Sequence, residues 1–234
     1  MIKYYKGTVF NSGAQAMVNT INTIGFMGAG IALEFRLRYP EMYIDYEKKC
    51  EEKKLKIGKV DYFQDKSGVM IVNFPTKAHF KYPSRMEWIE KGLQNFTETY
   101  EKYGIKSIAF PKLGANHGGL KWEEVKIVME KYLFPLDIEI IICLDELKEA
   151  EGIEKEMLNR FNEIDIDSLA KKVRLTKKQK EIIENSRPLD RFWKISKLES
   201  IGVKTYENLF KYFYNIDDIK EPSIGQQQSL FDYL

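Results

Sequence analysis

Residues 1–144 alternate short apolar runs with longer amphipathic stretches, a pattern typical of an α/β fold. Two of the runs, Gly68–Asn73 and Ile138–Cys143, are apolar almost throughout, which indicates strands buried on both faces of a sheet. The pattern predicts strands at Ile2–Tyr5, Ala16–Ile21, Val60–Gln64, Val69–Asn73, Ser107–Phe110 and Ile138–Cys143.

The amphipathic stretches between these runs predict helices. One helix follows Gly28, and a second covers Pro40–Lys54. A third begins near Ser84, which together with Glu87 fits a capping box. A fourth begins near Lys121. Strands and helices therefore alternate along this whole part of the chain.

The strand-like runs stop after about residue 146, and the rest of the chain is highly charged with helical periodicity. We expect a first domain over residues 1–150, an all-helical domain over residues 151–220 and a flexible tail over residues 221–234. A helix over Glu146–Phe161 would connect the two domains.

The composition agrees with a globular chain of 234 residues, of which 44% are hydrophobic. The net charge of +2 gives no general attraction to nucleic acid or membrane. No apolar run approaches the roughly 20 residues that cross a bilayer, and the first residues do not form a signal peptide. Cys50 and Cys143 lack metal or redox spacing. We therefore expect a cytoplasmic protein with reduced thiols and without membrane contact, cofactor or metal.

A glycine-rich loop joins a strand to a helix within Val18–Ala32. The apolar run ends at Asn22, and Gly25, Gly28 and Gly30 follow before the helix. Glycines let backbone N–H groups approach phosphates, and the start of a helix adds free donors with a partial positive charge. This loop predicts a diphosphate site; the alternative is a turn that needs glycine only for its geometry.

Three further segments follow predicted strands and would lie at the same edge of the sheet, where open α/β sheets bind ligands. They are Gly7–Val9, Phe74–His79 and Pro111–Leu120. The last is a second glycine-rich loop between a strand and a helix. Two such loops facing one crevice would hold a diphosphate from both sides.

Residues 1 to about 145 resemble the macrodomain family, which binds ADP-ribose in a three-layer α/β/α fold with a mixed sheet. Within the family the motifs are most similar to the subclass of DNA ADP-ribosyl glycohydrolase antitoxins (DarG) and the terminal ADP-ribose protein glycohydrolase. The matching motifs are Val18–Asn22, Met27–Phe35, Asn73–His79 and Gly118–Trp122.

The resemblance implies that Asn22 binds the distal ribose and that Lys77 is the catalytic residue. A partly desolvated lysine has a lowered pKa, so it can attack the anomeric carbon as an amine or stabilise the leaving base. His117 would be either an acid–base group or a packing residue. The residues implied to bind ADP-ribose, largely through backbone N–H groups, are Thr8, Val9, Asn22, Gly25, Met27, Gly28, Gly30, Ile31, Thr76, Pro111, Leu113, Gly114, Ala115, Asn116, His117, Gly118 and Gly119.

Two features depart from the family pattern. Gly118 stands where protein-directed relatives carry an acidic partner for the lysine, so we do not expect a lysine–aspartate mechanism. The segment Gly7–Phe10 lacks the adenine-binding Asp of many macrodomains. Backbone groups and stacking would then hold the adenine.

These motifs favour an enzyme that removes ADP-ribose from DNA bases by cleaving an N-glycosidic bond. Such an enzyme would act as an antitoxin or in DNA repair, with DNA and a cognate ADP-ribosyltransferase toxin as partners. Two alternatives stay open. The first is a hydrolase of ADP-ribosylated protein or O-acyl-ADP-ribose. The second is a non-catalytic ADP-ribose-binding module, which the altered loop at Ala115–His117 favours.

Two C-terminal motifs suggest macromolecular partners. Leu198–Phe213 predicts a helix, a turn at Gly202 and a helix, and resembles the helix-hairpin-helix element that binds DNA backbones. The basic clusters Lys171–Arg174 and Lys177–Lys180 would assist, or would form ordinary solvated faces. Gln227–Phe231 resembles the peptide that binds the bacterial sliding clamp; the alternative is a tail that packs on its own domain.

Overall fold

A computed structural model describes residues 1–215, which form two compact units. The first covers Met1–Glu146, and the second begins at Leu147. The predicted tail over residues 221–234, with the clamp-like motif Gln227–Phe231, lies outside the described residues.

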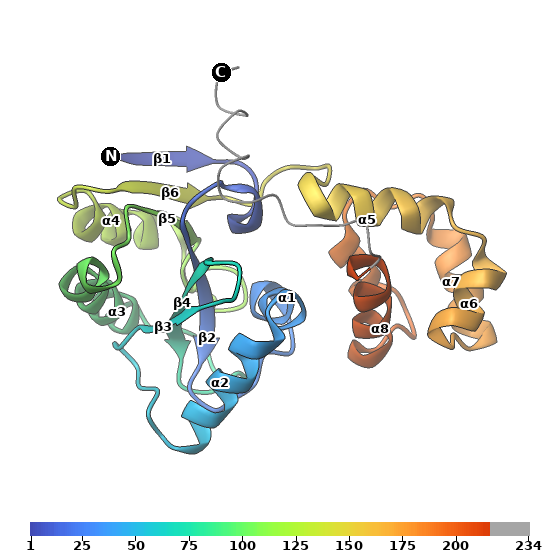
Figure 1. Cartoon of the computed structure of the whole chain (residues 1–234), viewed down its shortest axis with the longest axis horizontal. Helices are drawn as coiled ribbons and strands as arrows, with labels where there is room; N and C mark the ends of the chain where they lie inside the picture. The colour runs from blue at the N-terminus through green and yellow to red at the C-terminus, as the bar shows by residue number, and fades with distance from the viewer. Residues whose placement is uncertain (216–234) are drawn as a thin grey trace. The chain divides into compact units, whose positions relative to one another are not determined.

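The strands of the first unit form one six-stranded sheet in the order β1-β6-β5-β2-β4-β3 (Figure 1). Strand β3 at one edge pairs antiparallel with β4, and every other pairing is parallel. The sheet is therefore mixed, as predicted. The strands are β1 (Ile2–Tyr5), β2 (Ala16–Asn22), β3 (Asp61–Gln64), β4 (Met70–Lys77), β5 (Ser107–Pro111) and β6 (Glu139–Cys143).

Helices cover both faces of this sheet and complete the three layers expected from the sequence (Figure 1). Helices α1 (Gly30–Arg38) and α2 (Pro40–Glu51) pack on one face. Helices α3 (Met86–Thr99) and α4 (Trp122–Leu133) pack on the other. The short 3-10 helices are η1 (Val9–Asn11) and η2 (Tyr100–Tyr103).

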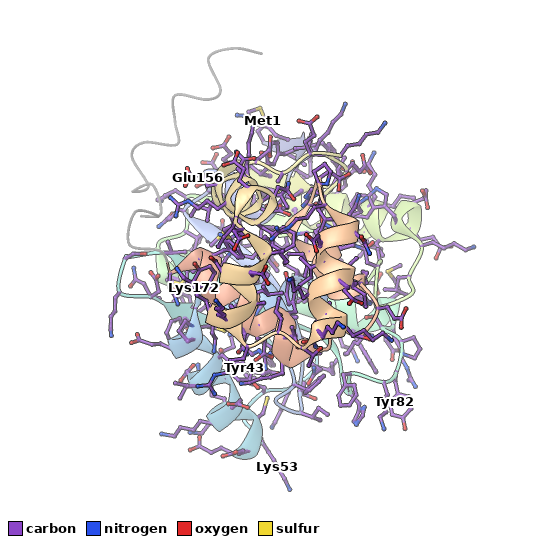
Figure 2. The ribbon with its side chains drawn as sticks, turned by 90° about the vertical axis from the view of Figure 1, so that its right-hand side faces the viewer. Met1, Tyr43, Lys53, Tyr82, Glu156 and Lys172 are labelled. Atoms are coloured by element: carbon purple, nitrogen blue, oxygen red, sulfur yellow. The ribbon has the colours of Figure 1, made fainter. Side chains whose placement is uncertain are left out.

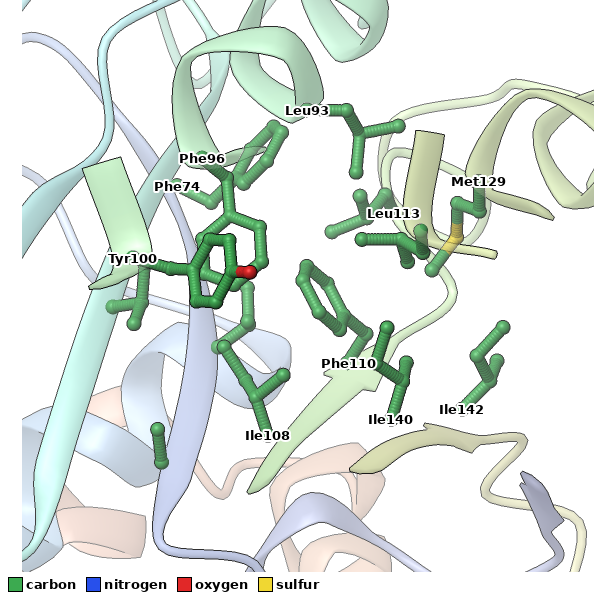
Figure 3. Close-up of a cluster of buried hydrophobic side chains, with 14 of the residues drawn as sticks. Phe74, Leu93, Phe96, Tyr100, Ile108, Phe110, Leu113, Met129, Ile140 and Ile142 are labelled. Carbon is green, nitrogen blue, oxygen red and sulfur yellow. The ribbon is translucent and has the colours of Figure 1, made fainter. Parts of the chain in front are cut away.

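Alternation along the strands divides the core of this unit into two layers. Val18 of β2 packs toward α3 and α4, whereas its neighbour Met17 packs toward α1 and α2. In the first layer Phe96 and Phe110 are fully buried and meet edge to face, with ring centroids 5.3 Å apart (Figure 3). This packing fixes the strand ends from which the site loops emerge.

The capping box predicted at Ser84 is wrong. Helix α3 begins at Met86 with Arg85 as its N-cap, and no side chain caps it. Ser84 is buried, and its backbone N–H donates to the carbonyl oxygen of Gly118 at 2.9 Å. The residue therefore supports a loop of the site instead of the start of a helix.

The helix predicted to begin at Glu146 begins six residues later, as α5 (Gly152–Glu163). The N–H of Leu144 donates to Tyr5 O at 2.8 Å, and that of Glu146 donates to Lys6 O at 2.7 Å. These bonds tie the chain after β6 to the segment after β1, and Asp145 between them has φ of +51°, so a helix does not start there.

Helices of the second unit surround an aromatic core. Phe192 lies among Phe161, Phe210 and Phe213, and each pair of rings meets at a steep angle with centroids 5.8 to 6.0 Å apart. The described helices of this unit are α5, α6 (Ile166–Val173), α7 (Lys177–Ser186), η3 (Phe192–Lys197) and α8 (Val203–Tyr214).

A buried ion pair joins α5 to η3 in the same unit. The Nε of Arg191 donates to both carboxylate oxygens of Glu154, each at 3.1 Å. The backbone N–H of Phe192 donates to the same carboxylate at 2.9 Å, and Nη1 of Arg191 donates to Leu147 O. Several donors thus satisfy this buried charge.

Cys50 and Cys143 are both free thiols. Across residues 1–215, no helix is long and apolar enough to span a membrane. The same residues contain no group of three His, Cys, Asp or Glu side chains placed to hold a metal ion.

Candidate functional site

The carboxyl ends of four parallel strands bring the predicted motifs to one edge of the sheet. In sheet order, Gly7–Val9 follows β1, residues 112–121 follow β5, residues 23–29 follow β2 and residues 78–85 follow β4. The two glycine-rich loops are therefore neighbours in the middle of this edge. Open α/β sheets bind ligands at such an edge.

Lys77 and Asn22 lie side by side at the ends of adjacent strands. The pairing of β2 with β4 shifts by one residue between Ile21 and Asn22, so Ile21 lies opposite Pro75 and Asn22 lies opposite Lys77. This irregularity brings the two candidate residues into register at the mouth of the edge.

The side chain of Asn22 shapes the loop that follows it. Its Oδ1 accepts a hydrogen bond from the N–H of Ile24 at 3.1 Å, and its Nδ2 donates to Phe26 O. The hydroxyl of Tyr46 donates to the backbone oxygen of Asn22 at 2.9 Å. The second hydrogen of the Asn22 amide has no partner within residues 1–215, so ribose binding by this residue stays a prediction.

Lys77 is half-buried, and its partners among residues 1–215 are carbonyl groups. Its Nζ donates to His117 O at 2.5 Å and lies 3.5 Å from Phe80 O. No carboxylate in the described part of the chain pairs with it, and burial lowers the pKa of its ammonium group. A larger fraction of this lysine is therefore the neutral, nucleophilic amine.

The loop after β5 presents three adjacent backbone donors. Gly114 and Gly119 adopt φ of +63° and +78°, which favours glycine. The N–H of Leu120 donates to Gly114 O at 3.0 Å and closes the loop. The N–H groups of residues 116–118 have no acceptor within residues 1–215. Consecutive free N–H groups of this kind can bind an anion, and we call residues 116–118 the nest.

Gly118 has no room for a side chain. A Cβ at this position would lie 2.1 Å from Gly114 O and 2.5 Å from the Oγ of Ser84. A side chain at position 118 would therefore displace the loop.

The start of α1 faces the same nest. Gly30 has φ of +57°, and the first hydrogen bond of the helix runs from the N–H of Leu33 to Ala29 O. Among the described residues, the N–H groups of residues 30–32 therefore have no acceptor, as at any helix start. The ring of His117 covers Gly30, because a Cβ on Gly30 would lie 2.9 Å from Cδ2 of the histidine. The two loops are thus in contact through His117, which is exposed.

Five predicted binding residues other than glycine are buried: Val9, Asn22, Met27, Thr76 and Leu113. Val9, Met27 and Leu113 have apolar side chains and can reach a ligand only through their backbone. The side chains of Asn22 and Thr76 instead donate hydrogen bonds within the protein. Two further residues support the site, Tyr46 and Ser84, and the sequence does not reveal this role. The helical spacing of apolar residues in α2 indicates that Tyr46 is buried, and a buried hydroxyl needs a partner, but nothing in the sequence identifies Asn22 as that partner.

In the second unit the predicted turn precedes α8. Ser200 has φ of +60°, and the N–H of Ile201 donates to Leu198 O at 3.2 Å. The helix predicted to begin at Leu198 is wrong, because the element before the turn is the 3-10 helix η3, which ends at Lys197. Among the nearby lysines, Lys178 pairs with Glu199 and Lys180 pairs with Asp167, which reduces their net positive charge.

Comparison with known proteins agrees with this geometry. The family model described as Macro domain matches residues 18–129. A DNA ADP-ribosyl glycohydrolase from Thermus aquaticus is 39% identical over 58% of this chain and 39% of its own length. A DNA ADP-ribosyl transferase–glycohydrolase fusion protein from Thermosipho africanus is 35% identical over 59% of this chain and 40% of its own length. The chain spans about two fifths of these relatives.

Solved structures show the same fold. The macrodomain of Mycobacterium tuberculosis DarG superimposes with a TM-score of 0.60 and 38% identity, over 61% of this chain and 97% of that chain. Thermosipho africanus DarTG in complex with ADP-ribose superimposes with a TM-score of 0.60 and 33% identity, over 66% of this chain and 44% of that chain. The chain therefore belongs to the macrodomain family, and it is similar to the DarG macrodomains within that family.

Proposed function

We propose that the first unit is an ADP-ribosyl glycohydrolase that releases ADP-ribose from DNA bases. The observation that carries this proposal is the position of Lys77, whose pKa is lowered by burial and which lies beside Asn22 and the nest at residues 116–118. Relatives named DNA ADP-ribosyl glycohydrolase support the substrate, and a related structure contains ADP-ribose.

The order of the loops suggests how the ligand lies. The adenosine end would contact Thr8 and Val9 after β1, where the backbone offers polar groups. The diphosphate would accept hydrogen bonds from residues 30–32 and 116–118. The distal ribose would then reach Asn22 and Lys77 at the β4 end of the edge.

The chemistry follows from a neutral amine near the anomeric carbon. The Lys77 amine would form a bond to that carbon as the bond to the base breaks, and the base would leave with the electron pair and take a proton. Water would then hydrolyse the lysine adduct and yield ADP-ribose. In the alternative role, a charged Lys77 would stabilise the leaving base.

A protein-linked substrate is the second candidate, because the same pocket would hold its ADP-ribose. The close contacts around Gly118 argue against a protein-linked substrate, since an acidic partner for Lys77 does not fit at that position. A non-catalytic ADP-ribose-binding module is the third candidate.

The test compares ADP-ribose release from enzymatically modified single-stranded DNA and from a glutamate-linked protein substrate. The proposal predicts release of ADP-ribose from DNA. The control variant Lys102→Ala should release it at the wild-type rate, because Lys102 is an exposed lysine before β5, at the opposite edge of the sheet from the site. Release only from protein would favour the second candidate. Tight ADP-ribose binding without turnover on either substrate would favour the third.

We further propose DNA contact by the second unit and a toxin partner. The turn before α8, with the exposed Lys204, offers free amides and a cation to a phosphate. Lys204→Glu should weaken binding to an unmodified oligonucleotide, whereas Lys102→Glu should not.

A related fusion protein joins a transferase to a glycohydrolase, so co-expression with a DNA ADP-ribosyltransferase tests whether this chain protects cells from it.

The sliding clamp is a further proposed partner, through Gln227–Phe231. Capture of the clamp by the full chain, and its loss in Leu230→Ala with Phe231→Ala, would support this contact. Equal capture of the clamp by the wild type and by the double variant would exclude this contact.

A further inference from the structure

An exposed group of four aromatic rings borders Lys77. Phe80 lies between Phe26 and His79, with ring centroids 4.5 Å and 4.6 Å away, and His79 lies 5.3 Å from Tyr82. Phe26, Phe80 and Tyr82 are 45%, 38% and 64% exposed, and Tyr82 points outward in Figure 2. We call Phe26, His79, Phe80 and Tyr82 the aromatic platform. Contiguous exposed rings of this kind mark a binding surface.

The platform is joined to the candidate site through the backbone. The carbonyl of Phe80 lies 3.5 Å from Nζ of Lys77, and the hydroxyl of Thr23 donates to Ala78 O at 3.0 Å. The N–H of Lys81 donates to Nδ1 of His79 at 3.2 Å and fixes that ring. The platform therefore continues the site beyond the point where the distal ribose would end.

Cations alternate with the rings, and acidic residues are absent from this stretch. Between Thr76 and Arg85 the sequence contains Lys77, Lys81 and Arg85 but no Asp or Glu. Nζ of Lys81 lies 5.8 Å from the centre of the Phe80 ring. Arg85 is mostly exposed and lies 3.8 Å from Glu87, so its pairing is weak. Aromatic rings for bases and cations for phosphates together fit a nucleic-acid strand.

We propose that the aromatic platform stacks the bases of single-stranded DNA next to the nucleotide that carries ADP-ribose. This proposal rests on the proposed glycohydrolase function, because the bound DNA strand is the one whose modified nucleotide reaches Lys77. A single strand is the occupant because its bases are free to stack on protein rings, whereas those of a duplex already stack on each other. Phosphates of the same strand would meet Lys81 and Arg85.

The first test measures binding of an unmodified single-stranded oligonucleotide and of the matching duplex to the full chain by fluorescence anisotropy. The wild type should prefer the single strand. Tyr82→Ala and Phe80→Ala should each weaken its binding by roughly 5- to 150-fold, the range for loss of one stacked base. Tyr82→Phe should retain binding, and so should Phe134→Ala, a control on an exposed ring outside the platform.

The second test separates this proposal from the proposed function. Tyr82→Ala should raise KM for an ADP-ribosylated oligonucleotide but leave turnover of an ADP-ribosylated mononucleoside unchanged. If the wild type releases no ADP-ribose from DNA yet binds single strands through Tyr82, the proposed function fails and the platform stands. Oligonucleotide binding that is absent in the wild type, or equal in wild type and Tyr82→Ala, would overturn the platform.

Discussion

Nζ of Lys77 lies 2.5 Å from the carbonyl oxygen of His117, which joins the end of β4 to the glycine-rich loop after β5. The lysine is thus held by a neutral dipole instead of a carboxylate. A carbonyl orients the amine but opposes its deprotonation less than a full negative charge would. This contact positions a nucleophile beside the nest that would hold the diphosphate.

The pH dependence of turnover should reflect the lowered pKa of Lys77. Burial disfavours its charged form, so the fraction of neutral amine rises with pH and reaches one half at a pH below the ordinary pKa of a lysine. If the amine is the nucleophile, the rate of ADP-ribose release rises along the same curve. A rate of ADP-ribose release that falls as the pH rises toward the ordinary lysine pKa would indicate that the charged form of Lys77 acts instead.

The same shift predicts a change in stability with pH. Because the folded pKa is lower than the unfolded pKa, the unfolded chain binds more protons between the two values, and stability rises with pH across that window. Lys77→Met should remove this contribution. Urea unfolding of both proteins at several pH values measures it, and parallel curves would contradict the prediction.

Gly118→Ala should disturb the loop after β5. Its Cβ would collide with Gly114 O and with Oγ of Ser84, so the backbone must move, at a cost of about 1–3 kcal/mol. We expect at least a tenfold loss of ADP-ribose affinity by calorimetry. Gly202→Ala is the control, because a Cβ at that glycine meets open space. Unchanged affinity in Gly118→Ala would show that the loop does not bind the ligand.

Tyr46→Phe should loosen the loop after β2. It removes the hydroxyl that donates to Asn22 O, and it leaves a buried carbonyl without this donor, at a cost of about 1–3 kcal/mol. The free energy of unfolding in urea measures the effect. A change below about 0.5 kcal/mol would mean that another group replaces the hydroxyl.

Glu154→Ala should destabilise the second unit. It leaves the buried guanidinium of Arg191 without its carboxylate, which typically costs about 3–5 kcal/mol. Glu139→Ala removes an exposed partner of Lys3 and should cost less than about 1 kcal/mol. Urea unfolding followed by the fluorescence of Trp193, in a background that carries Trp88→Phe and Trp122→Phe, reports on the second unit. Equal effects of the two variants would contradict this account of the buried pair.

Local sequence signals predicted the strands and the edge of the site well. The apolar run that stops at Asn22 places that residue at a strand end, where the structure has it. The strand predicted to end at Asn73 instead continues to Lys77, because β4 pairs with β2 over this length. The strand starts differ by at most one residue, because alternation and apolar runs determine them locally.

Long-range contacts could not be predicted in the same way. Ser84 has the local signal of an N-cap, but its N–H pairs with Gly118, which is 34 residues away. Likewise, Tyr46 reaches Asn22 across 24 residues. The one-residue shift between Ile21 and Asn22, which aligns Asn22 with Lys77, arises from strand pairing and leaves no mark in either strand alone.

Lys77→Arg tests the central claim most directly, with Lys77→Ala beside it. Arginine keeps a positive charge but cannot provide a neutral amine at accessible pH. Single-turnover release of ADP-ribose from modified single-stranded DNA should fall by at least a hundredfold in both variants. Calorimetry should show that ADP-ribose binding is retained within about tenfold, since the nest at residues 116–118 is intact. Release by Lys77→Arg at the wild-type rate would contradict the assignment of Lys77 as the nucleophile.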